Sequence, residues 1–197
     1  MRCIFISFFI LAGTIRATAQ DRQVLRDGDI IFIVNPSGQG KSIQLATKSK
    51  YTHVGIFFIE NGVPVVYHAV EPVSRNTLRE FISMSADGNY VVRRLKDQSM
   101  LTAGVVKKMR EQAVSRLGTH YDYAFDWDDE KLYCSEFVWK LYSNTLSISV
   151  GSPRALREFD LSHPAVKAAL RERYGDETPL GEQMISPGDM FNSSLLE

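Results

Sequence analysis

One cysteine and two histidines are the side chains in this sequence whose chemistry could make and break covalent bonds. Cys134 opens the stretch Cys134-Ser135-Glu136-Phe137-Val138, where the apolar residues recur with helical spacing. In the first turn of a helix, the dipole and the free backbone N–H groups stabilise a thiolate and can hold an oxyanion. Spacing alone supports two interpretations of Cys134 equally: a nucleophile, or a small apolar side chain packed under the helix.

The two histidines, His53 and His68, lie in β-rich runs that flank Asn61-Gly62. Asn-Gly between apolar runs predicts a β-hairpin with a two-residue loop, because both turn residues tolerate positive φ. In that register Glu60 pairs with Val63, and every other facing pair in the hairpin follows from this one.

The predicted register puts His53, Gly55 and His68 on one face of the hairpin. Gly55 lies opposite His68 and is expected to leave room above the sheet. The two histidines become diagonal neighbours, with backbones about 7–8 Å apart and side chains able to meet. They could be a base and the residue that orients it. The alternative is a pair of half-buried strand histidines without function.

The N-terminus has the pattern of a secretory leader. Met1-Arg2-Cys3 is a basic start, residues 4–12 are mostly apolar, and Ala17-Thr18-Ala19 is a small-residue cleavage site. The apolar run is too short to span a bilayer as a mature helix. Thr14 stands where a lipoprotein leader would have cysteine. We therefore predict a signal peptide at 1–19, a periplasmic or extracellular protein, and no stable membrane insertion.

Cleavage would change both the charge and the cysteine count. The chain has 23 Lys+Arg and 23 Asp+Glu residues, and loss of Arg2 and Arg16 leaves 21 basic against 23 acidic, a net charge of −2. Such a balance favours neither nucleic acid nor anionic membranes as a partner. Loss of Cys3 leaves Cys134 as the lone thiol. A lone thiol in an oxidising compartment is a liability unless it is buried or used.

The elements that must position these residues fit one domain, residues 20–197, which is long enough for its own core. Apolar runs predict strands at 30–34, in the hairpin, at 90–94 and at the edge segment 185–190. Helical spacing predicts helices at 42–49, 77–84, 100–117, 134–142, 153–159 and 163–174. The expected fold class is α+β, a small antiparallel sheet with the Cys134 helix packed on it.

Other polar segments lack the spacing of a cofactor or metal site. Segment 35–42 ends like a P-loop, but Asn35 stands where that motif needs glycine, so we interpret it as a polar loop near the cleft. The acidic run 122–130 lacks the spacing and glycine of a calcium loop. One cysteine with scattered histidines lacks zinc-ligand spacing. We assign His120 and His163 no role, and we expect no cofactor and no metal.

Six segments spread over nearly all of the mature chain carry a resemblance to a known family: Asp27-Gly28-Asp29-Ile30-Ile31, Tyr51-Thr52-His53-Val54-Gly55-Ile56, Tyr67-His68-Ala69-Val70-Glu71-Pro72-Val73, Tyr121-Asp122, Leu132-Tyr133-Cys134-Ser135-Glu136-Phe137-Val138 and Ser186-Pro187-Gly188-Asp189. They resemble the YiiX-like family, in the permuted branch of the NlpC-type papain-like cysteine hydrolases. The resemblance is specific in the His and Cys motifs and loose between them.

The resemblance implies a circularly permuted papain-like (NlpC-type) fold, in which the histidine strand precedes the cysteine helix. It implies that Cys134 is the nucleophile, that His53 is its base, and that the polar residue orienting the base falls on His68. Many YiiX-like sequences carry Glu there, although the lecithin-retinol acyltransferase-like branch uses His. Tyr51, two residues before the base, is a candidate oxyanion or substrate contact, with core packing as the alternative.

The expected function is that of an exported cysteine amidase or peptidase that acts on peptidoglycan-derived peptides. Two alternatives stay open: a lipid amide hydrolase or acyltransferase, and a binding module that holds a small amino-acid-like ligand without turnover. The partner is then a small peptide, amide or lipid-like molecule. An apolar tunnel beside Cys134 would favour lipids, an acidic or amine-recognising end of the cleft would favour peptides, and an unreactive thiol would favour the binding module.

Overall fold

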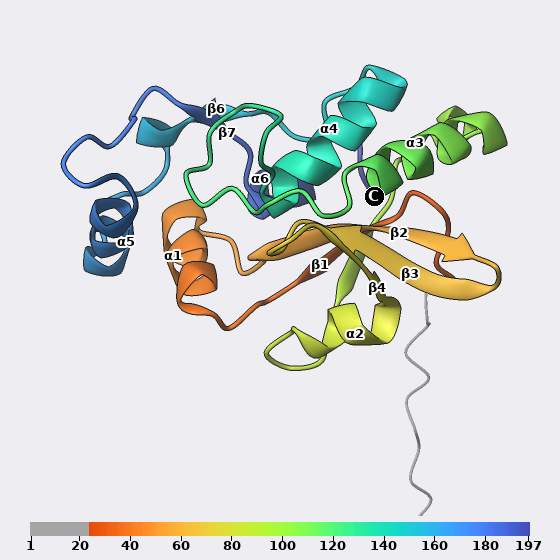
Figure 1. The fold of residues 1–197 in the computed structure, drawn as a ribbon, viewed down its shortest axis with the longest axis horizontal. Helices are drawn as coiled ribbons and strands as arrows, with labels where there is room; N and C mark the ends of the chain where they lie inside the picture. Colours follow the sequence, from red (N-terminus) through yellow and green to blue (C-terminus); the bar gives the residue numbers. More distant parts are fainter. Residues whose placement is uncertain (1–23) are drawn as a thin grey trace, which may run out of the picture.

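The computed structural model describes residues 24–197, so the leader predicted at 1–19 lies outside the described residues (Figure 1). Its main feature is a five-stranded sheet in the order β4-β3-β2-β1-β5, in which all neighbours pair antiparallel. The strands are β1 (Ile30–Ile33), β2 (His53–Glu60), β3 (Val63–His68), β4 (Ser74–Thr77) and β5 (Val91–Arg93). The predicted α+β class with a small antiparallel sheet is confirmed.

Helices cover both faces of this sheet. Figure 1 shows α3, α4 and α6 on one face, α2 on the other, and α1 beside α5 at one end. The helices are α1 (Gly38–Thr47), α2 (Leu78–Ser83), α3 (Ala103–Ser115), α4 (Cys134–Leu146), α5 (Pro164–Tyr174) and α6 (Pro187–Phe191). A small ribbon, β6 (Arg154–Ala155) with β7 (Gln183–Met184), and two 3₁₀ turns, Gln98–Met100 and Leu156–Glu158, complete the described chain.

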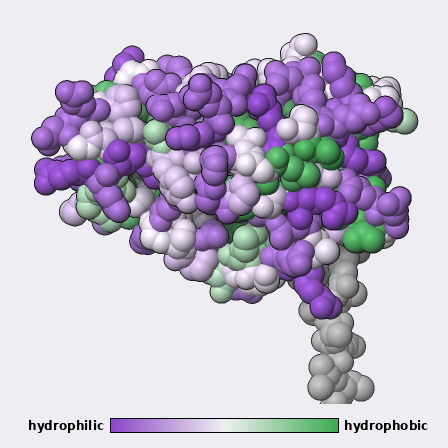
Figure 2. Space-filling view, in the orientation of Figure 1, coloured by the Kyte–Doolittle hydropathy of each residue, from purple (hydrophilic) through white to green (hydrophobic). Residues whose placement is uncertain are grey.

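The sheet therefore carries apolar side chains on both faces. Val54, Ile56 and Phe58 point into the larger core with α4. Phe57 and Val66 point into a smaller core that Phe81 of α2 completes. Figure 2 shows a mostly hydrophilic surface with a few hydrophobic areas in the same view. No helix in residues 24–197 is long and apolar enough to cross a membrane.

The hairpin forms with the predicted register. Glu60 pairs with Val63, and each pair further along keeps the same register. Asn61 and Gly62 have φ of 50° and 79°, as the turn requires. The room expected above Gly55 is taken up instead, because a Cβ on Gly55 would lie 2.9 Å from the Tyr67 carbonyl oxygen. Gly55 thus lets β3 approach β2 closely.

Helix α4 starts at Cys134, as predicted, and runs four residues beyond the predicted end, to Leu146. Its buried face, which includes Phe137, Val138 and Leu141, packs on the sheet. Glu136 accepts a hydrogen bond from the Tyr133 backbone N–H, which satisfies one of the free donors at the helix start.

Three sequence-based assignments were wrong in type or extent. Helix α1 begins at Gly38 because Ser37 caps it, so much of the predicted polar loop is helical. Segment 153–159 forms β6 and a 3₁₀ turn, since its backbone pairs with the segment around Glu182. Segment 185–190 starts α6, because Ser186 and Asp189 form a capping box with Pro187 in the first turn.

Candidate active site

The two histidines meet as the hairpin register predicts. Nε2 of His53 lies 2.8 Å from Nδ1 of His68. Nε2 of His68 lies 2.8 Å from the amide oxygen of Asn76 on β4. An amide oxygen only accepts, so His68 carries its proton on Nε2 and accepts at Nδ1. His53 therefore donates from Nε2, which leaves a lone pair on its Nδ1.

Phe81 of α2 holds both rings in place. It stacks on His53 with centroids 5.6 Å apart and meets His68 edge-on at 5.0 Å. Burial lowers the pKa of His53 well below its ordinary value, and the neighbouring His68 lowers it further. Burial also lowers the pKa of His68, while the bond to Asn76 acts in the opposite direction. Both imidazoles are therefore neutral bases at neutral pH.

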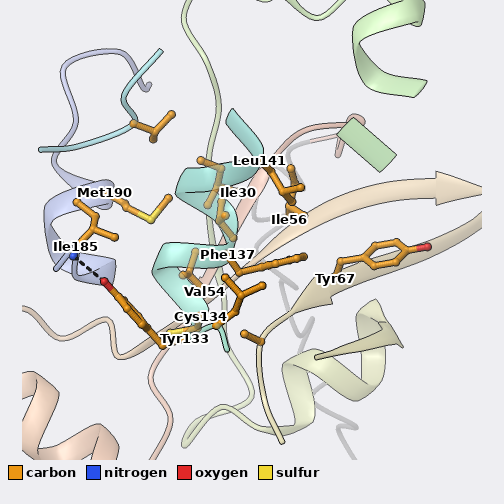
Figure 3. Packing of buried hydrophobic residues seen from close by; sticks show 14 of the residues in the cluster. Ile30, Val54, Ile56, Tyr67, Tyr133, Cys134, Phe137, Leu141, Ile185 and Met190 are labelled. Carbon is orange, nitrogen blue, oxygen red and sulfur yellow. Dashed lines mark hydrogen bonds between the residues drawn. The ribbon is translucent and has the colours of Figure 1, made fainter. Parts of the chain in front are cut away.

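Cys134 lies against β2, beside the residue that follows His53. The side chains of Cys134 and Val54 are neighbours at the start of α4 (Figure 3). Burial raises the pKa of the thiol to about 11, and backbone hydrogen bonding from Val54 and Ser135 acts in the opposite direction. The thiolate expected from the helix start is thus outweighed by desolvation, and the resting thiol is protonated.

Two cavities open on the two reactive groups. We call them the thiol cavity, which Cys134 lines, and the imidazole cavity, which His53 lines. Both are also lined by Gln39 and Tyr121. Gln39 donates a hydrogen bond of 2.8 Å to the Tyr121 hydroxyl, so this bonded pair lies where the two cavities meet.

Within residues 24–197, no hydrogen bond joins the thiol of Cys134 to the imidazole of His53. Catalytic hydrogen bonds are often long in substrate-free enzymes and tighten in the substrate complex. Cys134 and His53 thus lie on neighbouring backbone segments, and each lines one of the two cavities.

Two hydrogen bonds hold the start of α4 against the segment that precedes α6. The Ile185 backbone N–H donates to the Tyr133 hydroxyl at 3.0 Å, the bond drawn in Figure 3. The Ser135 hydroxyl donates to the Ile185 carbonyl at 2.7 Å. These two bonds attach the residues on either side of Cys134 to the segment that precedes α6, which fixes the position of the thiol.

Three polar residues of the site were missed in the sequence: Asn76, Gln39 and Tyr121. Asn76 shares a face with His68 because Ser74 pairs with His68, but the loop between β3 and β4 gives no signal for that register. Gln39 was assigned to a polar loop. Tyr121 belongs to a recognised motif and received no role; burial and the nearby Cys134 raise the pKa of its phenol well above the usual range.

The structure places Tyr51 in the core. Its ring lies 4.3 Å from that of Phe191 and 5.8 Å from that of Phe32, measured between centroids. It does not line the thiol cavity or the imidazole cavity. This position matches the core-packing alternative, and Tyr121 is the tyrosine that lines both cavities.

A cysteine at the start of a helix that packs on an antiparallel sheet, with a histidine on a strand of that sheet, is the arrangement of papain-like cysteine hydrolases. The histidine strand precedes the cysteine helix in this chain, which makes the order permuted. Residues 24–197 match the model of a family described as "Permuted papain-like amidase enzyme, YaeF/YiiX, C92 family". The chain belongs to this family, and the YiiX-like resemblance and the permuted papain-like fold are confirmed.

Two comparisons with individual proteins support the same family. The chain is 44% identical over 169 residues to YiiX of Escherichia coli strain K12, a protein described as uncharacterized; this covers 86% of the chain and 83% of YiiX. A crystal structure described as that of metalloprotein yiiX from Escherichia coli O157:H7 matches with a TM-score of 0.83 at 44% identity. That match covers 87% of this chain and 94% of the other.

Because that structure is described as a metalloprotein, we tested whether the side chains of this chain could hold a metal ion. Within residues 24–197, no group of three or more His, Cys, Asp or Glu side chains is placed so that it could hold a metal ion. The two histidines of the hairpin are bonded to each other, and His68 is also bonded to the amide oxygen of Asn76. The described residues do not fit a metal centre, and we derive no step through one.

Proposed function

We propose that the protein is an exported cysteine amidase in which Cys134 is the nucleophile, His53 its base and His68 the orienting partner. The observation that carries the proposal is the hydrogen-bonded chain Asn76–His68–His53, which leaves a lone pair on the imidazole next to the segment that contacts Cys134. A neutral imidazole with a free nitrogen is the group that a protonated thiol needs.

The first half of the reaction forms a thioester. His53 takes the thiol proton as the sulfur of Cys134 bonds to the amide carbonyl carbon. The carbon–nitrogen bond then breaks, and the leaving nitrogen takes the proton from His53 and departs as an amine. In this half of the reaction His53 is positively charged only between these two transfers, and the hydrogen bond to His68 stabilises that charge.

The second half returns the enzyme to its starting state. His53 takes a proton from water as the water oxygen bonds to the thioester carbonyl carbon. The carbon–sulfur bond breaks, the proton passes to the sulfur of Cys134, and a carboxylic acid leaves. One amide and one water thus become one acid and one amine.

The negative oxygen formed in each half needs hydrogen-bond donors. The Cys134 backbone N–H, at the free start of α4, is one. The Tyr121 hydroxyl is a second candidate, because it lines the thiol cavity and stays protonated. A binding module would need neither donor.

Export rests on the leader pattern at residues 1–19, with cleavage after Ala19. In that compartment peptidoglycan-derived peptides are one accessible class of amide substrate. Lipid amides, in which the acyl group is a hydrocarbon chain, are the other class.

The reaction is tested with p-nitrophenyl acetate, by following p-nitrophenol release and the intact mass. We expect an acetyl group on Cys134, no adduct in Cys134→Ala, and a rate at least about a hundredfold lower in His53→Ala. His163→Asn is the matched histidine control and should keep the wild-type rate, because His163 only caps α5. Equal slow rates in the wild type and His53→Ala would favour the binding module.

A further inference from the structure

Two buried acidic residues contact the segment that leads into Cys134. Asp122 is 2% exposed, and Glu136 is fully buried. The Asp122 backbone N–H donates to the Leu132 carbonyl at 3.2 Å. One oxygen of Glu136 accepts from the Tyr133 backbone N–H, also at 3.2 Å. Both acidic residues are therefore bonded to the two residues that immediately precede the thiol.

Each of these carboxyl groups keeps one oxygen without a donor. Among the described residues, Oδ2 of Asp122 and Oε1 of Glu136 have no hydrogen-bond partner. Nζ of Lys140 lies 2.8 Å from this oxygen of Glu136, but it donates to the Asp129 carboxylate instead. A buried carboxylate oxygen without a donor is costly, and two such carboxylates near each other also repel. A single proton would remove both costs.

The charges around the two groups favour such a proton at neutral pH. Burial raises the pKa of Glu136 to about 7; the charge of Asp122 acts in the same direction and Lys140 in the opposite one. Burial also raises the pKa of Asp122. The other charged or titratable groups around them are Asp126, Asp128 and Asp129 of the loop before α4, Arg116, Tyr133, and Arg173 and Tyr174 of α5.

We infer that Asp122 and Glu136 share one proton, and that this carboxyl pair positions Cys134. The O–H of one group donates to the free oxygen of the other, which joins segment 121–122 to the first turn of α4. Tyr121 lines both cavities, and Cys134 is the first residue of α4. The shared proton therefore fixes the separation between this wall of the site and the thiol.

Loss of the proton leaves two buried carboxylates that repel, so the two segments should move apart as the pH rises above about 7. Glu136→Gln and Asp122→Asn remove this dependence on pH. In each variant an amide N–H can donate in place of the shared proton, and one carboxylate remains, so the net charge of the pair is unchanged.

The positioning role is tested by kcat/KM for p-nitrophenyl acetate between pH 6 and pH 9, corrected for the reaction with hydroxide. This part of the inference rests on the proposed function, because it takes Cys134 as the nucleophile. The rate of each amide variant is divided by that of the wild type, which cancels the pH dependence of the thiol and of His53. We expect this ratio to rise by at least about threefold from pH 6 to pH 9.

The shared proton is tested without any reaction, by infrared spectroscopy of the C=O stretch of a protonated carboxyl group. Ordinary Asp and Glu side chains are ionised at pH 6, since their pKa values are about 4. We expect a protonated-carboxyl band in the wild type at pH 6 that is lost by pH 9. Both amide variants should lack the band at either pH.

Glu172→Gln is the matched control for both measurements, because Glu172 is exposed on α5. It should keep the infrared band, and its rate relative to the wild type should not change with pH. If Glu136→Gln does not fold, Asp122→Asn gives the same comparison.

The outcomes separate this inference from the proposed function. Absence of the band in the wild type at pH 6, or its survival in both amide variants, would overturn the shared proton. A band that behaves as expected, together with rate ratios that stay constant with pH, would overturn the positioning role. Failure of the ester to acylate Cys134 in the wild type would overturn the amidase, and the infrared result would still decide the shared proton.

Discussion

At the residue scale, the proposed site uses a second imidazole, that of His68, to orient the base. A neutral imidazole cannot by itself determine which of its nitrogens carries the proton. Asn76 does so, because its amide oxygen accepts from His68. Asn76 is therefore a positioning residue that acts on His53 through His68.

Asn76→Ala should lower kcat for ester hydrolysis by roughly 10- to 100-fold, as loss of an outer partner of a histidine typically does. KM should change little, because Asn76 does not line the two cavities. Steady-state kinetics across pH 5 to 9 measures both effects.

Asn76→Asp is the conservative control. An aspartate also accepts from His68, so we expect it to restore most of the rate. Its charge should raise the pKa of the imidazole pair and move the acidic limb of the pH profile upward. Loss of activity in both variants with an unchanged profile would indicate a role in stability alone.

At the element scale, the β2–β3 hairpin brings the two histidines together, and Gly55 allows the close approach of its strands. A Cβ at this position would lie 2.5 Å from Val66 Cγ1 and 2.9 Å from the Tyr67 carbonyl oxygen. The backbone contact cannot be relieved by a rotamer change, so β3 would have to shift together with His68.

Gly55→Ala should therefore lower the free energy of unfolding by about 1–3 kcal/mol and also reduce activity. Urea denaturation measures the first effect. Gly104→Ala is the matched control: Gly104 lies in α3, nothing lies within 4 Å of an added Cβ there, and alanine should stabilise the helix by about 0.5–1 kcal/mol. Equal stability of Gly55→Ala and the wild type would show that β3 moves without cost.

The elements also show which assignments the sequence supported. The Asn61-Gly62 turn between two β-rich runs determined the register from adjacent residues, and the hairpin formed as predicted. Segments 153–159 and 185–190 were assigned wrongly, because contacts with distant chain and a local cap outweighed their apolar patterns.

At the scale of the whole molecule, the buried histidines make stability depend on pH. Burial lowers the pKa of His53 and His68, so the unfolded chain binds more protons below pH ~6.5. The two neutral histidines contribute fully to the free energy of unfolding above that pH, and this contribution is lost as the pH falls and the unfolded chain takes up protons. Glu136 acts in the opposite direction, because burial raises its pKa to about 7 and the folded chain holds that proton.

The free energy of unfolding should thus fall between pH 6.5 and 5, with a slope that approaches about 1.4 kcal/mol per pH unit for one net proton. Glu136→Gln removes the opposing group and should make the fall steeper by up to the same amount. Urea denaturation at several pH values measures both slopes. A flat profile for the wild type, or equal slopes for the two proteins, would contradict this assignment of protons.

The sequence by itself determined the parts of this protein that depend on neighbouring residues: the hairpin register, the facing of His53 and His68, the cysteine at a helix start, and the motifs that carry the family. Only the tertiary structure decided the rest. Gln39 and Tyr121 meet across 82 positions, and the thiol cavity needs α1, α5 and the β6–β7 ribbon together. Such contacts depend on how distant elements pack, and the periodicity of apolar residues within one element does not indicate which other elements it will contact.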